Sequence, residues 1–62
     1  MLTEHDVEAG LELMAEFGWP SRDAAMAVVD AENGIDTFAP TPPHIQRLYG
    51  DLESMLNTAS TS

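Results

Sequence analysis

Three boundary signals divide this chain into helix-length segments and so decide what it can fold into. Gly18 and Pro20 form the first signal, an Asn33-Gly34 pair forms the second, and three prolines between residues 40 and 43 form the third. Glycine just past a helix end and proline at a helix start are typical boundary residues. Because the chain has 62 residues, it holds one domain at most, and these signals predict three short helices.

The first segment predicts a helix over residues 4–17. Thr3 is a suitable N-cap, and Asp6 lies where its carboxylate completes a capping box. Gly18 fits the position just after the helix, and Pro20 prevents continuation. Residues that recur at spacings of three and four define one apolar helix face: Val7, Gly10, Leu11, Met14, Phe17 and Gly18.

The second segment predicts a helix over residues 22–33, with Ser21 as its N-cap. It is rich in alanine, which lets a neighbouring helix approach closely. Asn33-Gly34 ends it, and Ile35 is expected to fold back as the apolar contact that often follows such an end.

The third segment predicts a helix over residues 42–57, with Thr41 as N-cap and Pro42 in the first position. Its apolar stripe is the cleanest in the chain: Ile45, Leu48, Tyr49, Leu52, Met55 and Leu56. The predicted fold is therefore an all-α, compact three-helix bundle over residues 1–57. Residues 58–62 are small and polar, and we expect them to form a flexible, disordered C-terminal tail.

Charge and composition exclude several classes of function. Two arginines and no lysine oppose eleven acidic residues, which gives a net charge of -9. Direct nucleic-acid binding is not expected, because phosphate contacts need clustered Lys or Arg. The chain has no cysteine, no apolar run of about 20 residues and no signal-peptide pattern at its start. We therefore expect a cytoplasmic protein without disulfides or membrane contacts.

No residue pattern points to catalysis or to a bound cofactor. The chain lacks an HExxH motif, a glycine-rich phosphate loop and a Ser-His-Asp arrangement. His5 and His44 each lack a second histidine or a cysteine at ligand spacing, so no metal site is expected. The sequence predicts a protein that is not an enzyme and uses no cofactor.

The most distinctive charge pattern is a ladder of glutamates at intervals of four residues: Glu4, Glu8, Glu12 and Glu16. Like charges at this spacing on a helix are mildly destabilising. One interpretation is a solvated face, or an adaptation to high salt. The other is an anionic stripe that binds a basic groove on a partner protein, imitating a nucleic-acid backbone if Asp6, Asp51 and Glu53 contribute.

The second interpretation predicts the function: a small acidic inhibitor or adaptor, in the style of mobile-element and phage products that block host machinery. Charge steers it to a basic protein surface, which in one version belongs to a nucleic-acid-binding protein. Four aromatic residues are expected to serve as apolar anchors: Phe17, Trp19, Phe38 and Tyr49.

The turn Phe17-Gly18-Trp19 supports a second hypothesis. Together with Ala25 and the Asn33-Gly34 turn, it resembles the order of features in ubiquitin-associated domains, which are also small three-helix bundles. About 20 residues carry the resemblance, and Phe17 replaces the methionine of the family's loop. It implies a recognition module that docks through this turn, without implying ubiquitin as the ligand.

A third hypothesis is a structural subunit. If the first two helices cover only half of the apolar stripe on residues 42–57, the rest forms the seam of a homodimer.

Overall fold

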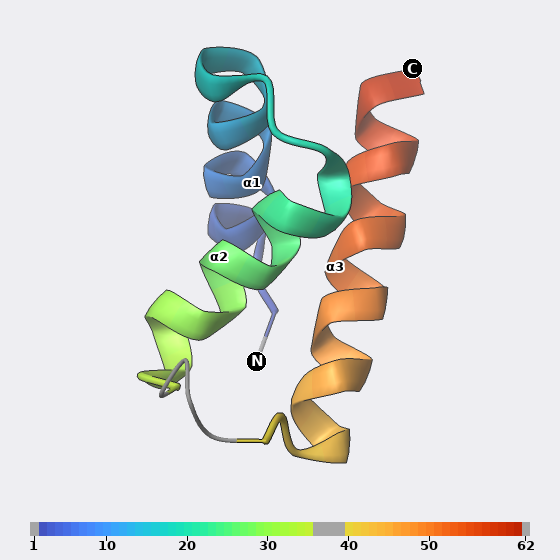
Figure 1. The fold of residues 1–62 in the computed structure, drawn as a ribbon. Coiled ribbons are helices and arrows are strands. Elements are labelled where there is room, and N and C mark those ends of the chain that lie inside the picture. The colour runs from blue at the N-terminus through green and yellow to red at the C-terminus, as the bar shows by residue number, and fades with distance from the viewer. Residues whose placement is uncertain (1, 36–39, 62) are drawn as a thin grey trace.

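The computed structural model describes residues 2–35 and 40–61. It contains three helices, α1 (Glu4–Phe17), α2 (Ser21–Asn33) and α3 (Pro43–Thr61), and no strand among these residues. In Figure 1, α1 and α3 stand on either side and α2 crosses obliquely between them, returning toward the start of α1. The predicted all-α three-helix bundle is confirmed.

The two ends of α1 form as the sequence predicts. The Thr3 hydroxyl accepts a hydrogen bond from the Asp6 N–H at 3.4 Å, and the Asp6 carboxylate accepts one from the Thr3 N–H at 2.7 Å. Gly18 ends the helix at φ +67°, and its N–H donates to the Met14 carbonyl at 3.1 Å. A positive φ of this kind favours glycine, which has no Cβ.

The start of α2 differs from the prediction by one residue. Ser21 is the first helical residue and not the N-cap, which is Pro20 at φ -61° and ψ 154°. The Pro20 carbonyl accepts the Ala24 N–H at 3.0 Å, and no side chain caps the helix. The rigid proline ring already holds the boundary conformation, so a serine side chain is not needed there. At the other end Gly34 is left-handed, and Ile35 packs against the core as expected.

The bounds of α3 also differ from the prediction. Thr41 is not the cap: the Pro42 carbonyl accepts the first helical N–H bonds, from Ile45 at 3.0 Å and Gln46 at 3.1 Å. The helix begins at Pro43 and continues to Thr61, four residues past the predicted end. The Thr58 hydroxyl donates to the Ser54 carbonyl at 3.0 Å, a local hydrogen bond between a polar side chain and the helix backbone. None of the described helices is long and apolar enough to cross a membrane.

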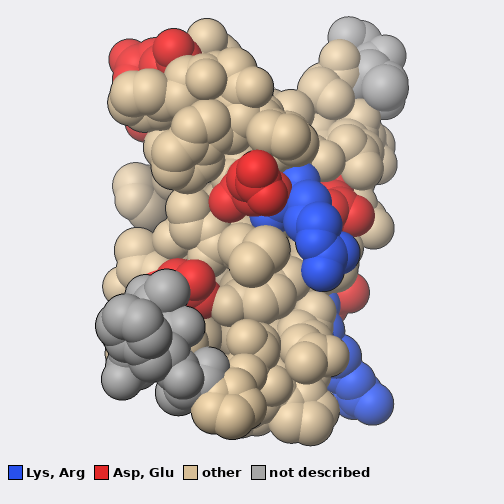
Figure 2. All heavy atoms as spheres, in the orientation of Figure 1, with Lys and Arg blue, Asp and Glu red and all other residues tan. Residues whose placement is uncertain are grey.

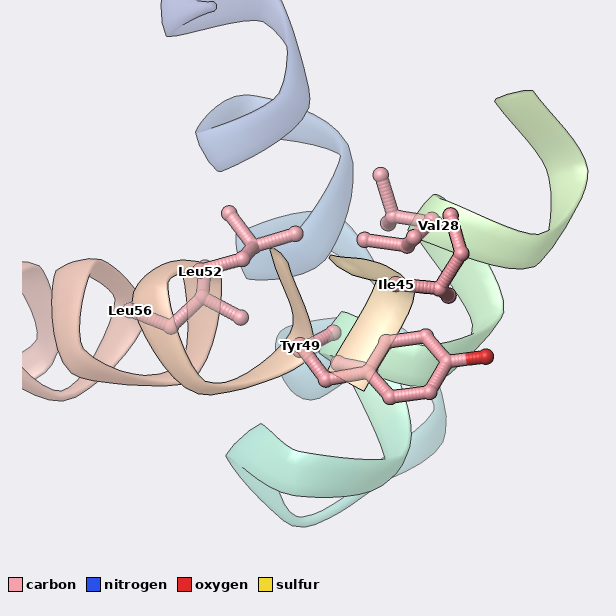
Figure 3. Packing of buried hydrophobic residues seen from close by; sticks show 8 residues of the cluster. Val28, Ile45, Tyr49, Leu52 and Leu56 are labelled. Carbon is pink, nitrogen blue, oxygen red and sulfur yellow. The ribbon is translucent and has the colours of Figure 1, made fainter. Parts of the chain in front are cut away.

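The core lies mainly between α2 and α3 (Figure 3). Its buried apolar members are Ala24, Ala25, Val28, Val29, Ile45, Tyr49, Leu52 and Leu56. Helix α1 adds no large apolar side chain that is fully buried; Val7, Leu11, Leu13 and Met14 pack on the core while remaining half-buried.

Helix α1 approaches α3 closely at one glycine. A Cβ placed on Gly10 would lie 2.7 Å and 2.8 Å from the two terminal carbons of Leu56, which is itself fully buried. Such distances are well inside van der Waals contact, so this position is reserved for a residue without a side chain.

Two large apolar residues of the predicted faces lie outside the core. Phe17, the last residue of α1, is 62% exposed, and Met55 of α3 is 44% exposed. The rest of the α3 stripe is buried or half-buried within the bundle. Little of it is left to form the seam of a homodimer.

Candidate functional site

A groove of about 430 Å³ lies between α1 and α2. Its lining comes from one face of α1, from the second half of α2 and from the corner that joins them: His5, Asp6, Ala9, Glu12, Leu13, Glu16, Trp19, Ala27, Val28, Ala31 and Glu32. Helix α2 returns toward the start of α1 (Figure 1). The carboxyl groups of Asp6, in the first turn of α1, and Glu32, in the last turn of α2, therefore lie together, whereas Trp19 follows the other end of α1.

The groove joins an apolar floor to an acidic edge. The floor consists of alanine, leucine and valine side chains, and four carboxylic acids border it. Neither Arg22 nor Arg47, the only two basic residues other than histidine, belongs to the lining. His5 is the one lining residue able to bear a positive charge.

Asp6 is the least ordinary residue of the groove. Its side chain is 1% exposed, and one carboxylate oxygen, Oδ2, accepts the Thr3 N–H. The other oxygen, Oδ1, is buried without a hydrogen-bond partner in the protein. A buried charge with an unsatisfied oxygen is unfavourable unless something neutralises or binds it.

Glu32 can bind this buried carboxylate, because its carboxyl group adjoins that of Asp6. The contact between the two carboxyl groups lowers the pKa of Asp6, which the hydrogen bond from the Thr3 backbone lowers further. The same contact raises the pKa of Glu32, with desolvation and the charge of Asp6 acting in the same direction. When both carboxyl groups are ionised, neither can donate a hydrogen bond, and Asp6 Oδ1 has no partner. When Glu32 is protonated, its O–H donates a hydrogen bond to Asp6. The sequence analysis missed this pair, since no spacing rule connects residues on different helices.

The glutamate ladder is exposed along its whole length on α1. Only Glu12 and Glu16 border the groove between α1 and α2, whereas Glu8 lines a second hollow on α1 that Glu12 also borders. Glu4 lines neither hollow. The ladder therefore does not lie within one hollow, since Glu12 borders both hollows and Glu4 borders neither.

The acidic residues predicted on α3 do not join the groove. Asp51 is exposed elsewhere, and Glu53 is half-buried in a separate hollow that Arg22 and Tyr49 also line. In the face shown in Figure 2, acidic side chains form separate patches, and those near the middle of the view adjoin basic side chains. This face has no continuous acidic band of the kind that would imitate a nucleic-acid backbone.

The predicted aromatic anchors differ in their exposure to solvent. Phe17 and Trp19 are 62% and 40% exposed, and their ring centroids lie 5.8 Å apart. Tyr49 is 8% exposed and its hydroxyl donates to the Asp30 carboxylate, so it is a core residue and not a surface anchor (Figure 3). Phe38 lies outside the described residues.

In the part of the chain that the structure describes, no three His, Asp or Glu side chains are arranged to hold a metal ion. Comparison with known proteins identifies no relative: no family model, no curated protein and no solved structure matches this chain.

Proposed function

We propose that this protein is a small acidic, non-enzymatic inhibitor or adaptor that docks on a basic surface of a partner protein. The observation that supports this most is the exposure of all four ladder glutamates on α1, beside a groove with no arginine or lysine in its lining. An apolar groove with a charged border is the usual composition of a recognition surface.

The electrostatics favour such a partner. A net charge of -9 on 62 residues produces a field that speeds encounter with a basic surface and repels acidic ones. In the free protein, glutamates four residues apart repel each other by roughly 0.2–0.5 kcal/mol per pair. A basic partner removes this repulsion on binding, so the ladder favours the complex over the free state.

The partner class that fits best is a nucleic-acid-binding protein, because its own binding groove is rich in Lys and Arg. The ladder repeats about every 6 Å along the helix, and a stripe of that spacing can pair with basic side chains in such a groove. The proposed effect is competition with the partner's nucleic acid.

The test begins with affinity capture from the native host, using a cross-linker, followed by a binding assay with the captured partner. Binding should weaken steeply with salt, and the double reversal Glu8→Lys/Glu12→Lys should abolish it. The matched variant Asp51→Lys/Glu53→Lys changes the net charge equally on α3, where it should weaken binding far less. Equal losses from the two variants, or none from the first, would reject an α1 docking surface.

The exposed aromatic corner favours a second candidate, a recognition module that docks through Phe17 and Trp19. Tryptophan is enriched among residues that dominate binding energy. In this case Trp19→Ala should cost roughly 2 kcal/mol or more of binding free energy while leaving the helical content unchanged. Binding would then depend little on salt, which separates this candidate from the first.

A further inference from the structure

We infer that the groove between α1 and α2 binds an arginine side chain of the partner protein, with the guanidinium between the carboxyl groups of Asp6 and Glu32. This inference rests on the proposed function, since it names the chemical group by which a basic partner is held. It adds a defined binding position to a proposal that otherwise depends on the general charge of α1.

A buried carboxylate oxygen at one end of the groove favours a positively charged ligand. Asp6 Oδ1 is buried without a partner, and the carboxyl group of Glu32 lies beside it. Two adjacent carboxylates repel each other, so the pair retains one proton more readily than separate carboxyl groups do. A guanidinium supplies a positive charge together with donors for both carboxylates, and so replaces the shared proton.

The apolar floor of the groove suits the stem of an arginine side chain. Its floor is made by short apolar side chains of both helices, among them Leu13 and Val28. An arginine has a three-carbon stem that packs on apolar surface while its head remains with polar groups. Trp19 closes the other end of the groove and covers apolar parts of the partner near the arginine backbone.

The chemistry of the lining selects arginine over other cations. A metal ion would need several ligands around one point, and no three acidic or histidine side chains in the described residues are arranged in that way. A lysine ammonium is strongly hydrated and acts as a point charge. The planar guanidinium is less hydrated and pairs with two acceptors at once, which suits two carboxyl groups at the end of an apolar groove.

The experiment is a two-dimensional NMR titration of the intact chain with N-acetyl-arginine amide, at pH 7 and low salt. The neutral citrulline derivative is the isosteric control, and the lysine derivative tests the choice of cation. We expect amide shifts concentrated at Ala27, Ala31 and Glu32 and at the Trp19 indole N–H. The arginine derivative should bind most tightly, the lysine derivative more weakly, and citrulline should cause no shift at these positions.

Two variants test whether the binding position is the one inferred. Glu32→Gln removes a charge and gives Asp6 a permanent amide donor, so the arginine derivative should bind about two- to fivefold more weakly, as for loss of one ion pair. Asp51→Asn removes the same charge from α3 outside this groove and should change the affinity by less than about 1.5-fold.

Equal losses in the two variants would overturn the inference, since binding would then follow net charge. Shifts from citrulline equal to those from arginine, or a lysine derivative that binds as well, would also overturn it. No partner protein enters this titration, so a failure here leaves the charge-reversal test of the proposed function standing. Conversely, a groove that binds arginine in a protein whose α1 reversal is without effect would refute only the docking surface on the ladder.

Discussion

Asp6 illustrates how one residue serves local structure and a candidate site at once. Its Oδ2 closes the capping box at the start of α1, its Oδ1 is buried without a hydrogen-bond partner, and its carboxyl group lies beside that of Glu32 in the groove. The first role follows from sequence, because Thr3 and Asp6 have the spacing that capping requires. The second role depends on where α2 returns, so it becomes visible only in three dimensions.

The Asp6–Glu32 pair makes stability depend on pH in a definite direction. The lowered pKa of Asp6 gives a contribution that is present above its ordinary pKa of 3.8 and is lost as the pH falls through the folded value. The raised pKa of Glu32 gives a contribution to stability that is present below its ordinary pKa of 4.5 and is lost as the pH rises through the folded value. The pair therefore stabilises the fold most near pH 4 and less toward neutrality.

Urea unfolding of Glu32→Gln between about pH 3 and 7 tests this prediction. The glutamine amide donates to Asp6 at every pH, so the variant should lose the decline above about pH 4.5 that we expect of the parent. Glu8→Gln is the control for the general effect of removing one charge, and it should keep that decline. A Glu32→Gln profile that parallels the Glu8→Gln profile would show that the pair does not share a proton.

Tyr49 is a second residue whose place differs from the prediction, since it was expected to be a surface anchor. Its ring is buried and its O–H donates to Asp30, which raises the pKa of Tyr49; burial raises it further. We expect Tyr49→Phe to lower the free energy of unfolding by about 1 kcal/mol at pH 7, the usual net value of one hydrogen bond. Because the pKa is raised, the contribution present below pH 10 should be lost as the pH rises through the folded value. Parent and variant should therefore converge in alkaline urea titrations, and a neutral substitution at pH 7 would contradict this account.

At the scale of helices, boundaries were more predictable than faces. Gly18 and Gly34 end their helices in the left-handed conformation that the sequence indicated. The starts of α2 and α3 were each displaced by one residue, because Pro20 and Pro42 hold the boundary that Ser21 and Thr41 were expected to hold. Serine and threonine caps are one solution to unsatisfied N–H groups, and a preceding proline with its fixed φ is another.

The faces of the helices depend on tertiary packing, which periodicity does not determine. Phe17 shares a spacing with Met14 and Gly10, yet it lies at the end of α1 and is exposed. Tyr49 has the polar tip of a border residue, yet its hydroxyl finds a partner on α2 and the ring is buried. Whether an amphipathic side chain is buried is decided by the neighbouring helix.

Two glycines in helix interiors give a matched pair of predictions about packing. Gly10→Ala gains up to about 1 kcal/mol of helix propensity but forces Leu56 aside in a fully packed core, which costs roughly 1–3 kcal/mol. We expect a net loss of about 1 kcal/mol in the free energy of unfolding. Gly50→Ala has the same propensity gain with no atom within 4 Å of the new carbon. It should stabilise α3 by about 0.5–1 kcal/mol.

Urea denaturation of both variants under one set of conditions measures the contrast. The change in the free energy of unfolding should have opposite signs in the two variants. Both variants gain helix propensity, and only Gly10→Ala brings a new carbon against Leu56. Stabilisation by Gly10→Ala would mean that α1 and α3 separate without cost, and that the close approach does not hold the bundle together.

At the scale of the whole molecule, α1 is the weakly held helix and also the most negatively charged one. The fully buried apolar side chains belong to α2 and α3. Four exposed glutamates lie on α1, and its first and last turns contain no basic residue. The helix proposed to bind the partner is thus the one whose attachment depends most on screening of charge.

This arrangement predicts that salt stabilises the free protein. Three glutamate pairs at four-residue spacing together oppose α1 by about 1 kcal/mol at low ionic strength. Raising NaCl from about 0.05 M to 1 M shortens the screening length to about 3 Å and should remove most of this repulsion. The expected rise in Tm is about 4–8 °C, the shift that about 1 kcal/mol produces in a domain of this size.

A substitution separates repulsion along the ladder from a general effect of salt. Glu8→Lys converts two repulsive pairs, with Glu4 and Glu12, into attractive ones, so it should raise the Tm at low salt and flatten the response to NaCl. Thermal unfolding followed by circular dichroism measures both quantities, with Asp51→Lys as the control for net charge on α3. If parent and Glu8→Lys respond equally to salt, the ladder does not destabilise the free protein. Relief of repulsion along α1 would then contribute nothing to docking, and only direct contacts with the basic surface would remain to hold the partner.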